Sequence, residues 1–289
     1  MFRQREALMK LLNEARKILM AYKIQPRRKF SQNFLVDEAI LDKLISYASV
    51  DESDTVLEIG AGLGFLTERL ANVAGQVIAV EIDLSLVRIL TRRLNSYRNL
   101  VILRGDILKM ESLPYFNKVV SIPPYSISSP LIFWLLKRKF DCAVLTFQEE
   151  FGRRLVAQPG TKDYGRLTVA VYYYAEADLL DFIPKESFWP MPEVNSVIVR
   201  LRPRKPPFFV EDEKSFFNFI RAVFTQKNKK LRNAVITFLS SGGVPKNVYA
   251  QLIDSIPFHY MRVKEMSPED LALIFNNLVK RLHEMNYRV

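Results

Sequence analysis

The chain has 289 residues, a formal net charge of +11 at pH 7, and 49% hydrophobic and 25% charged residues. This length and composition predict a globular protein with one large domain and one smaller one. No run of about 18 apolar residues and no cleavable apolar leader occurs, so we expect a soluble, cytoplasmic protein with no membrane segment. The lone Cys142 excludes an intrachain disulfide. The two histidines, His259 and His283, are both near the C-terminus, which argues against a metal site or histidine-dependent catalysis.

The positive charge is concentrated in two segments. Residues 1–30 hold nine lysines and arginines against two acidic residues, and residues 200–233 hold ten against three. These segments together contribute +14, so the rest of the chain carries −3. Such segregation predicts a polyanionic partner, although a basic surface can also serve solubility alone.

A basic amphipathic helix is the first predicted element, over residues 3–22. Its apolar residues recur at helical spacing, with basic residues between them. Pro26 and the basic cluster at residues 27–29 end the pattern. We therefore expect residues 1–28 to form an extension that packs on the main domain or contacts the polyanionic partner.

Short strands then alternate with helical patterns, which predicts an α/β fold with a doubly wound, mainly parallel seven-stranded sheet. The composition changes around Pro203, and helical spacing follows. We expect the α/β domain to span residues 29–205 and a smaller helical domain to span residues 206–289. The predicted strands are Thr55–Gly60, Gln76–Asp83, Leu100–Arg104, Lys118–Ile122, Ala143–Phe147, Leu167–Tyr174 and Val194–Leu201.

The first predicted strand leads into a glycine-rich turn over residues 60–64. Glycines let a strand turn sharply and let the backbone approach a ligand at a helix N-terminus. The spacing here is G-x-G-x-G, which differs from the G-x-G-x-x-G of dinucleotide enzymes and disfavours a nicotinamide-dependent oxidoreductase.

Two acidic residues follow at the ends of the next two predicted strands, on the same edge of the sheet. Glu81 is placed to accept hydrogen bonds from two ribose hydroxyls, and Asp106 to accept one from an adenine amine. Either acid alone can instead be a helix cap. The ordered set of turn and acids predicts a cofactor that contains a nucleoside.

The fourth predicted strand runs into Pro123-Pro124-Tyr125. Paired prolines stiffen a loop, and a residue before proline is held extended, so its carbonyl can point into a cleft. A tyrosine in such a loop can stack on a base while the carbonyls accept hydrogens from an exocyclic amine. The loop therefore predicts a binding site for a planar base such as adenine.

With these motifs the sequence resembles the ribosomal small-subunit RNA adenine N6,N6-dimethyltransferases, which are relatives of the antibiotic-resistance methyltransferases that act on large-subunit RNA. The resemblance covers most of residues 29–235. Its marks stand in the family's order and are Ser31-Gln32-Asn33-Phe34-Leu35, Glu58-Ile59-Gly60-Ala61-Gly62, the Pro-Tyr loop with Ile127-Ser128-Ser129-Pro130, Gln148-Glu149-Glu150, Tyr164-Gly165-Arg166-Leu167, residues 188–196 and residues 226–233.

The resemblance implies a Rossmann-like class I methyltransferase that uses S-adenosylmethionine. Its expected reaction is direct in-line dimethylation of N6 of two adjacent adenosines in a hairpin loop near the 3′ end of small-subunit ribosomal RNA, with no metal. We expect a monomer whose partner is this RNA or the small ribosomal subunit.

The motifs and the resemblance together assign a catalytic loop and a cofactor site, and the basic segments supply the expected RNA contacts. The expected catalytic loop is Ile122, Pro123, Pro124 and Tyr125. The expected cofactor-binding residues are Gln32, Asn33, Leu35, Gly60, Gly62, Glu81, Ile82, Asp106, Ile107 and Ser121. The expected RNA-binding residues are Arg27, Arg28, Lys29, Lys227, Lys229, Lys230 and Arg232, together with Arg153, Arg154 and Arg166 near the mouth of the active site.

One position departs from the family's loop, which reads Asn-Leu-Pro-Tyr. Ile122 stands where the asparagine belongs, and it has no side-chain acceptor for the adenine amine. Ser121 can take over that role only if the loop shifts by one residue. The departure leaves open an alternative function, an RNA-binding ribosome assembly factor with weak or no methyl transfer.

Overall fold

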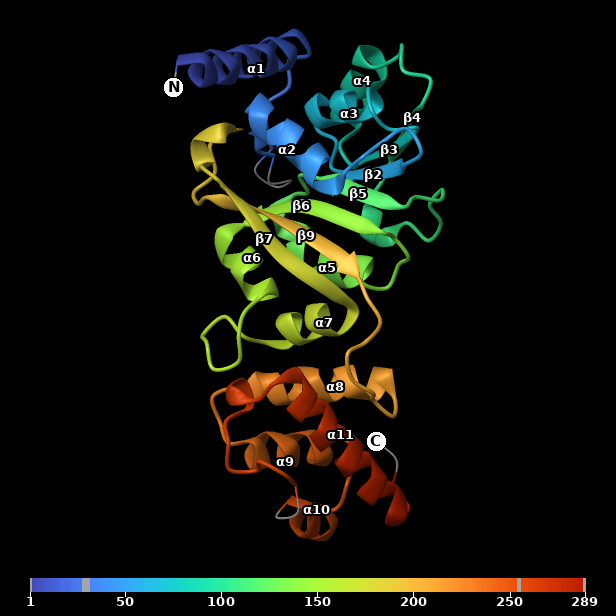
Figure 1. The fold of residues 1–289 in the computed structure, drawn as a ribbon, viewed down its shortest axis with the longest axis vertical. Helices are drawn as coiled ribbons and strands as arrows, with labels where there is room; N and C mark the ends of the chain where they lie inside the picture. Colours follow the sequence, from blue (N-terminus) through green and yellow to red (C-terminus); the bar gives the residue numbers. More distant parts are fainter. Residues whose placement is uncertain (1, 28–31, 254–255, 288–289) are drawn as a thin grey trace. The chain divides into compact units, whose positions relative to one another are not determined.

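The computed structural model describes residues 2–27, 32–253 and 256–287 and contains twenty helices and strands within these ranges, besides short 3-10 turns. Figure 1 shows their arrangement. The α-helices are α1 (Phe2–Ala21), α2 (Glu38–Ala48), α3 (Phe65–Ala71), α4 (Leu84–Arg93), α5 (Ser128–Leu135), α6 (Glu149–Leu155), α7 (Arg166–Tyr174), α8 (Glu213–Val223), α9 (Leu231–Ser241), α10 (Lys246–Ile253) and α11 (Pro268–Glu284). The strands are β1 (Phe34–Leu35), β2 (Thr55–Ile59), β3 (Gln76–Glu81), β4 (Leu100–Arg104), β5 (Lys118–Ser121), β6 (Cys142–Gln148), β7 (Ala175–Ile183), β8 (Phe188–Trp189) and β9 (Ser196–Pro203).

A seven-stranded sheet forms the centre of the α/β part, in the order β4-β3-β2-β5-β6-β9-β7. Strands β2 to β6 run parallel to their neighbours, whereas β9 pairs antiparallel with β6. The order reverses between β2 and β5, and in open α/β sheets ligands bind outside the carboxyl ends of the strands at such a switch point. The predicted fold class is therefore confirmed, and the glycine-rich turn and the Pro-Pro-Tyr loop leave the two strands at the switch point.

Helices cover both faces of this sheet. Helices α2, α3 and α4 lie on one face and α5 on the other (Figure 1). The strands between them are buried, with Val56, Leu57, Ile78 and Val119 fully inaccessible to solvent. Burial on both faces explains why these strands read as continuous apolar runs in the sequence.

One predicted strand is wrong. Residues 167–174 form helix α7, and the seventh strand of the sheet is β7, which follows directly. The run Leu-Thr-Val-Ala-Val-Tyr-Tyr-Tyr is rich in β-branched and aromatic residues, but nearly all of it is buried, so its apolar pattern shows no period that separates helix from strand. Strand β7 carries three acidic residues and is half-exposed, so its sequence lacks the apolar run by which the other strands were predicted. The other six predicted strands are confirmed to within two residues.

The chain divides into two compact units. The first comprises residues 1–152 and 177–203, and the second comprises residues 153–176 and 204–289. This division differs from the boundary predicted at residue 205, because Tyr164, Val169 and Tyr173 belong to the apolar core that α8 to α11 form. Within the predicted extension, Leu11, Ala15 and Leu19 belong to the apolar core of the first unit.

Helix α1 packs on the first unit through one apolar stripe. Leu11, Ala15 and Leu19 recur at four-residue intervals on this stripe and are buried. Beside the stripe, Glu14 accepts a hydrogen bond of 2.9 Å from Arg93 at the end of α4. The amphipathic pattern of α1 therefore reflects docking on the α/β part.

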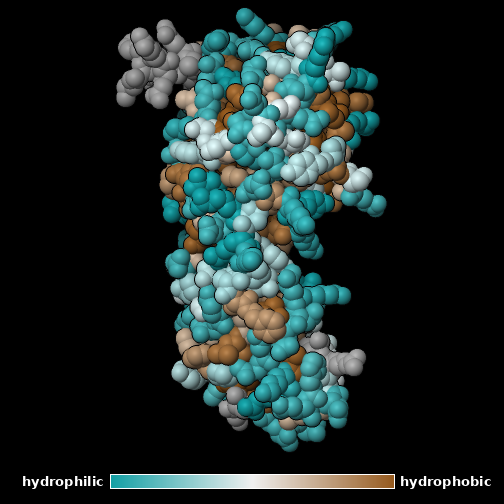
Figure 2. All heavy atoms as spheres, turned by 45° about the vertical axis from the view of Figure 1, so that its right-hand side comes forward, coloured by the Kyte–Doolittle hydropathy of each residue, from teal (hydrophilic) through white to brown (hydrophobic). Residues whose placement is uncertain are grey.

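Hydrophilic side chains cover most of the face in Figure 2, and apolar side chains appear there in separate patches. Across the described ranges, no helix is both long enough and apolar enough to cross a bilayer.

Candidate active site

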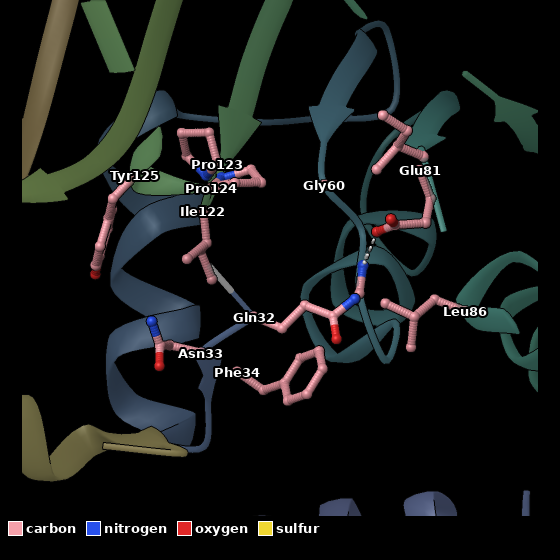
Figure 3. A pocket seen from close by; sticks show the side chains of 12 residues that line it. Gln32, Asn33, Phe34, Gly60, Glu81, Leu86, Ile122, Pro123, Pro124 and Tyr125 are labelled. Carbon is pink, nitrogen blue, oxygen red and sulfur yellow. Dashed lines mark hydrogen bonds between the residues drawn. The ribbon is translucent and has the colours of Figure 1, made fainter. Parts of the chain in front are cut away.

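A crevice opens at the switch point, and its walls come from segments far apart in the sequence. Residues before β1, the glycine turn after β2, the end of β3 and the loop after β5 all contribute (Figure 3). It is lined by Gln32, Asn33, Phe34, Gly60, Gly62, Glu81, Ile82, Leu86, Ile122, Pro123, Pro124 and Tyr125.

The glycine turn needs its glycines for two reasons. Gly60 and Gly62 have φ values of +79° and +59°, which side chains disfavour. A Cβ on Gly60 would also lie 3.0 Å from Cδ of Pro124, and a Cβ on Gly62 would lie 3.2 Å from the ring of Phe34. The turn, the Pro-Pro-Tyr loop and the chain before β1 are thus in close contact.

Glu81 anchors this turn from the end of β3. Its carboxylate accepts a hydrogen bond from the backbone N–H of Gly62 at 3.0 Å (Figure 3). It accepts another from the backbone N–H of Asp83 at 2.9 Å. Burial raises the pKa of Glu81, and these backbone N–H groups oppose the rise. A carboxylate has about four acceptor positions, so two remain for a ligand's hydroxyl groups.

Gln32 lines the crevice, and hydrogen bonds to Asp83 and Arg27 hold its side-chain amide. Its amide nitrogen donates to Asp83 at 3.1 Å, and its amide oxygen accepts from the backbone N–H of Arg27 at 2.7 Å. The guanidinium of Arg27 lies 3.6 Å from the same Asp83 carboxylate. Arg27, predicted to contact RNA, therefore lies beside Asp83 and Gln32 at the end of β3.

Asp106 lines an adjoining cavity and also caps a short turn. Its carboxylate accepts from the backbone N–H of Leu108 at 3.1 Å, so the cap expected from an isolated acid is present as well. Ile82, an apolar side chain that is 42% exposed, faces the same cavity. The cavity is lined by Ile59, Gly60, Val80, Glu81, Ile82, Gly105, Asp106, Ile107, Pro124, Ser126 and Ile127.

The Pro-Pro-Tyr loop holds Tyr125 at the edge of the crevice. The backbone carbonyl of Tyr125 accepts from Oγ of Ser128 at 2.9 Å, and its hydroxyl shares a hydrogen bond of 2.5 Å with Oγ of Ser196. Burial raises the pKa of Tyr125 to about 12. In Figure 3, Tyr125, Ile122 and Asn33 surround one end of the opening.

Ser121 does not line the crevice. It is fully buried, and its hydroxyl donates to the carbonyl of Ile59 at 2.6 Å and accepts from the N–H of Ile59 at 3.1 Å. Leu35 lines a third cavity with Asn33, and it pairs with Phe188 in the small β1–β8 sheet.

Glu58 is the site residue that sequence reasoning passed over. It lies inside β2, is 2% exposed, and lines the cavity around Asn33 and Gly60. Among the described residues its Oε2 has no hydrogen-bond partner. Burial is the main cause that raises the pKa of Glu58 to about 8. The available signal was a carboxylate within a strand that is otherwise apolar.

Most of the predicted RNA-binding residues belong to the second unit, whereas the residues that line the crevice belong to the first. Lys227 donates through Nζ to the backbone carbonyl of Lys162 at 2.7 Å, so it braces a loop there. Arg28 and Lys29 lie outside the described residues. The exposed members of the set in the second unit are Arg153, Arg154, Arg166, Lys229, Lys230 and Arg232.

The sheet order, the glycine turn at the switch point and the acid at the end of β3 define a class I methyltransferase. Residues 24–280 match the family model described as ribosomal RNA adenine dimethylase. The chain belongs to this family. It is therefore a methyltransferase and not a nicotinamide-dependent oxidoreductase.

Relatives and solved structures agree with this assignment. The chain is 47% identical to the probable ribosomal RNA small subunit methyltransferase A of Methanosarcina acetivorans, over 91% of this chain and 97% of the relative. A protein of the same name from Thermococcus kodakarensis is 41% identical, over 91% of this chain and 94% of that one.

Two crystal structures are similar over most of the chain. A dimethyladenosine transferase from Plasmodium falciparum is 32% identical with a TM-score of 0.73, over 87% of this chain and 98% of that one. The 23S rRNA methyltransferase ErmE is 28% identical with a TM-score of 0.63, over 85% of this chain and 99% of that one. The name of the second of these proteins gives 23S rRNA as its substrate.

Proposed function

We propose that this chain transfers methyl groups from S-adenosylmethionine to N6 of adenosines in small-subunit ribosomal RNA. The observation that carries the proposal is the contact between the glycine turn and the Pro-Pro-Tyr loop (the base loop), where a Cβ on Gly60 would lie only 3.0 Å from Cδ of Pro124. A cofactor over the turn and a base against the loop would therefore meet in one crevice. The names of the curated relatives support the RNA substrate.

The residues of the crevice fit S-adenosylmethionine. Gly60 and Gly62 form a cradle that a Cβ would fill, and Glu81 keeps acceptor positions for ribose hydroxyls. The exposed side chain of Ile82 would make apolar contact with the adenine ring of the cofactor. The carboxylate of Asp106 would accept a hydrogen bond from the amine of that same ring. When bound, S-adenosylmethionine supplies an electrophilic methyl group on its sulfonium.

The chain's own contribution is to position the target base. The ring of Tyr125 would stack on the adenine, and the carbonyls of Ile122 and Pro123 would accept the hydrogens of its N6 amine. Neither Pro123 nor Pro124 has a backbone N–H, so neither puts a backbone donor beside the amine. Hydrogen bonds from the amine to these carbonyls draw its lone pair out of the ring and toward the methyl donor.

The proposed target is a pair of adjacent adenosines in a hairpin loop near the 3′ end of the RNA, each receiving two methyl groups. Bases in loops can be splayed out of their stack, as a reaction at N6 requires. We further propose that a monomer binds the RNA or the small subunit, with exposed Lys229, Lys230 and Arg232 contacting phosphates.

A second candidate function follows from Ile122. The side chain offers no acceptor, and Ser121 is committed to the backbone of Ile59. A chain that binds S-adenosylmethionine and RNA but transfers methyl groups slowly or not at all would act as a ribosome assembly factor.

The deciding experiment is methyl transfer from radiolabelled S-adenosylmethionine to unmethylated small ribosomal subunits, followed by nucleoside analysis. We expect N6,N6-dimethyladenosine from the wild-type chain. Cofactor and RNA binding without labelled product would instead favour the assembly factor. Labelling of a different nucleoside, or no cofactor binding at all, would refute both proposals.

Cofactor binding has its own test in Glu81→Ala. Loss of hydrogen bonds to a charged group, and of the bond that anchors Gly62, should weaken S-adenosylmethionine binding by roughly a hundredfold in calorimetric titration. Glu111→Ala, an exposed position that does not line the crevice, is the matched control and should bind like the wild type. Equal affinities for the two variants would remove Glu81 from the cofactor site.

A further inference from the structure

The hydroxyl end of Tyr125 is tied to the first residue of strand β9. Its Oη lies 2.5 Å from Oγ of Ser196, and Ser196 is completely buried. These residues are 71 positions apart in the chain, so the contact depends on the sheet. Ser196 lies opposite Gln148 in the antiparallel β6–β9 pair, which sets its position.

Two other contacts restrain Tyr125, but neither sets the tilt of its ring by itself. Ser128 donates to the backbone carbonyl of Tyr125 and so holds the main chain. The ring of Phe188 meets that of Tyr125 edge-on, with centroids 6.5 Å apart and planes at 72°. An edge contact of this kind lets the ring slide, whereas a hydrogen bond at Oη ties down the far end of the side chain.

The fixed ring matters more in this chain because Ile122 supplies no acceptor for the base. Backbone carbonyls alone then orient the amine, and the stacking face must hold the base plane in the right place. If the ring swung away, the buried hydroxyl of Ser196 would lose its partner, which disfavours the swing.

We propose that Ser196 is a positioning residue that locks the ring of Tyr125 in the orientation that stacks the target adenine. This inference rests on the proposed function, because it concerns the same base site. Ser196 acts through Tyr125 and does not itself touch the substrate.

The test compares Ser196→Ala, Tyr125→Phe and the double variant. Each single change removes the same hydrogen bond and keeps an aromatic ring at position 125. We expect each to lower kcat by about tenfold to a hundredfold, while the Kd of S-adenosylmethionine stays at the wild-type value. The double variant should be no slower than the slower single variant, because only one bond is shared between the two residues.

Thr146→Val is the matched control for a general disturbance of the sheet. Thr146 is also completely buried, it lies on β6 close to the Ser196 pairing, and its hydroxyl has no hydrogen-bond partner among the described residues. We expect this variant to keep the wild-type kcat. A kcat of Ser196→Ala equal to that of Thr146→Val, or effects of Ser196→Ala and Tyr125→Phe that multiply in the double variant, would overturn the inference.

The wild-type arm separates the two levels of the proposal. An active wild type with an unimpaired Ser196→Ala refutes the role of Ser196 alone. A wild type that binds S-adenosylmethionine but methylates no ribosomal RNA refutes the proposed function, and the role of Ser196 with it.

Discussion

Ile122 is the position in the base loop where the side chain offers no hydrogen-bond acceptor to the target adenine. It stands at the entrance to a loop whose next two residues are prolines, so backbone carbonyls are the acceptors left for an adenine amine there. An added carboxamide would supply an acceptor that strengthens as charge develops on the amine. The loop is therefore the place where a single substitution can raise activity.

We predict that Ile122→Asn raises kcat roughly tenfold without changing the Kd of S-adenosylmethionine. Single-turnover methyl transfer to small subunits measures the chemical step directly. Ile122→Leu is the control, because it keeps the apolar contact and adds no acceptor. An Ile122→Asn variant no faster than Ile122→Leu would show that the backbone carbonyls already hold the amine fully.

Glu58 brings a titrating group into the core of the same site. Burial keeps its carboxyl neutral, so the folded chain retains a proton that the unfolded chain releases near the ordinary pKa of 4.5. Because the folded-state pKa is about 8, this group lowers the stability of the fold progressively as pH rises from about 4.5 to about 8.

We therefore predict that Glu58→Gln gains stability relative to the wild type as pH rises. The difference in the free energy of unfolding should shift by roughly 2 kcal/mol or more between about pH 5 and pH 9. Denaturant unfolding of the cofactor-free chain across this range provides the measurement. Glu52→Gln, on the exposed loop before β2, should show no such trend. A flat difference for Glu58→Gln would mean that the carboxyl is already ionised in the fold.

At the scale of elements, side-chain contacts join helix α1 to the α/β part of the chain. Glu14 of α1 holds Arg93, and Arg93 also donates to the backbone carbonyl of Leu63 in the glycine-rich turn. Arg93 further contacts Glu68 of α3 at 3.4 Å. The helix is thus connected to the turn through one arginine.

We predict that Leu19→Ala destabilises the chain by about 2–4 kcal/mol, because it leaves a cavity under α1. Met20→Ala changes the neighbouring residue, which is 78% exposed, and should leave the thermal midpoint near that of the wild type. Thermal unfolding of both variants makes the comparison. Equal midpoints for the two variants would show that α1 does not stay docked in solution.

The elements α7 and β7 show where sequence patterns stop being informative. Most of the run before residue 175 is buried within the second unit, with Tyr172 exposed, so burial and not propensity decides that it is helical. Strand β7 is the last strand in the sheet order and carries Asp178, which pairs with Arg200 of β9 at 2.9 Å. Asp178 also pairs with Arg202, whereas Asp181 of the same strand accepts hydrogen bonds from Lys43 and Tyr47 of α2.

At the scale of the whole molecule, the excess of positive charge gives a test that does not depend on catalysis. If Lys229 and Lys230 contact phosphates, changing both to glutamine should lower the slope of log K against log salt by about 1.5 for the RNA hairpin. Filter binding across a salt series would measure it.

The matched control removes the same charge elsewhere. Lys137 and Lys139 are exposed and lie just before β6, at the edge of the sheet opposite the crevice. Changing both to glutamine should alter the slope by much less. If the two double variants lose the same amount, the RNA is held by net charge alone and not by a surface around Lys229 and Lys230.

The sequence by itself determined the fold class, the switch-point crevice and most of its lining. It could do so because the glycine turn, Glu81, Asp106 and the Pro-Pro-Tyr loop each lie at or just after the carboxyl end of a strand, and parallel strands bring these ends to one edge. Only the tertiary structure decided that Ser121 faces the backbone of β2, that Ser196 holds Tyr125, and that residues 153–176 join the second core. These outcomes depend on contacts between distant residues, and such contacts are chosen by packing and by the need to pair buried polar groups.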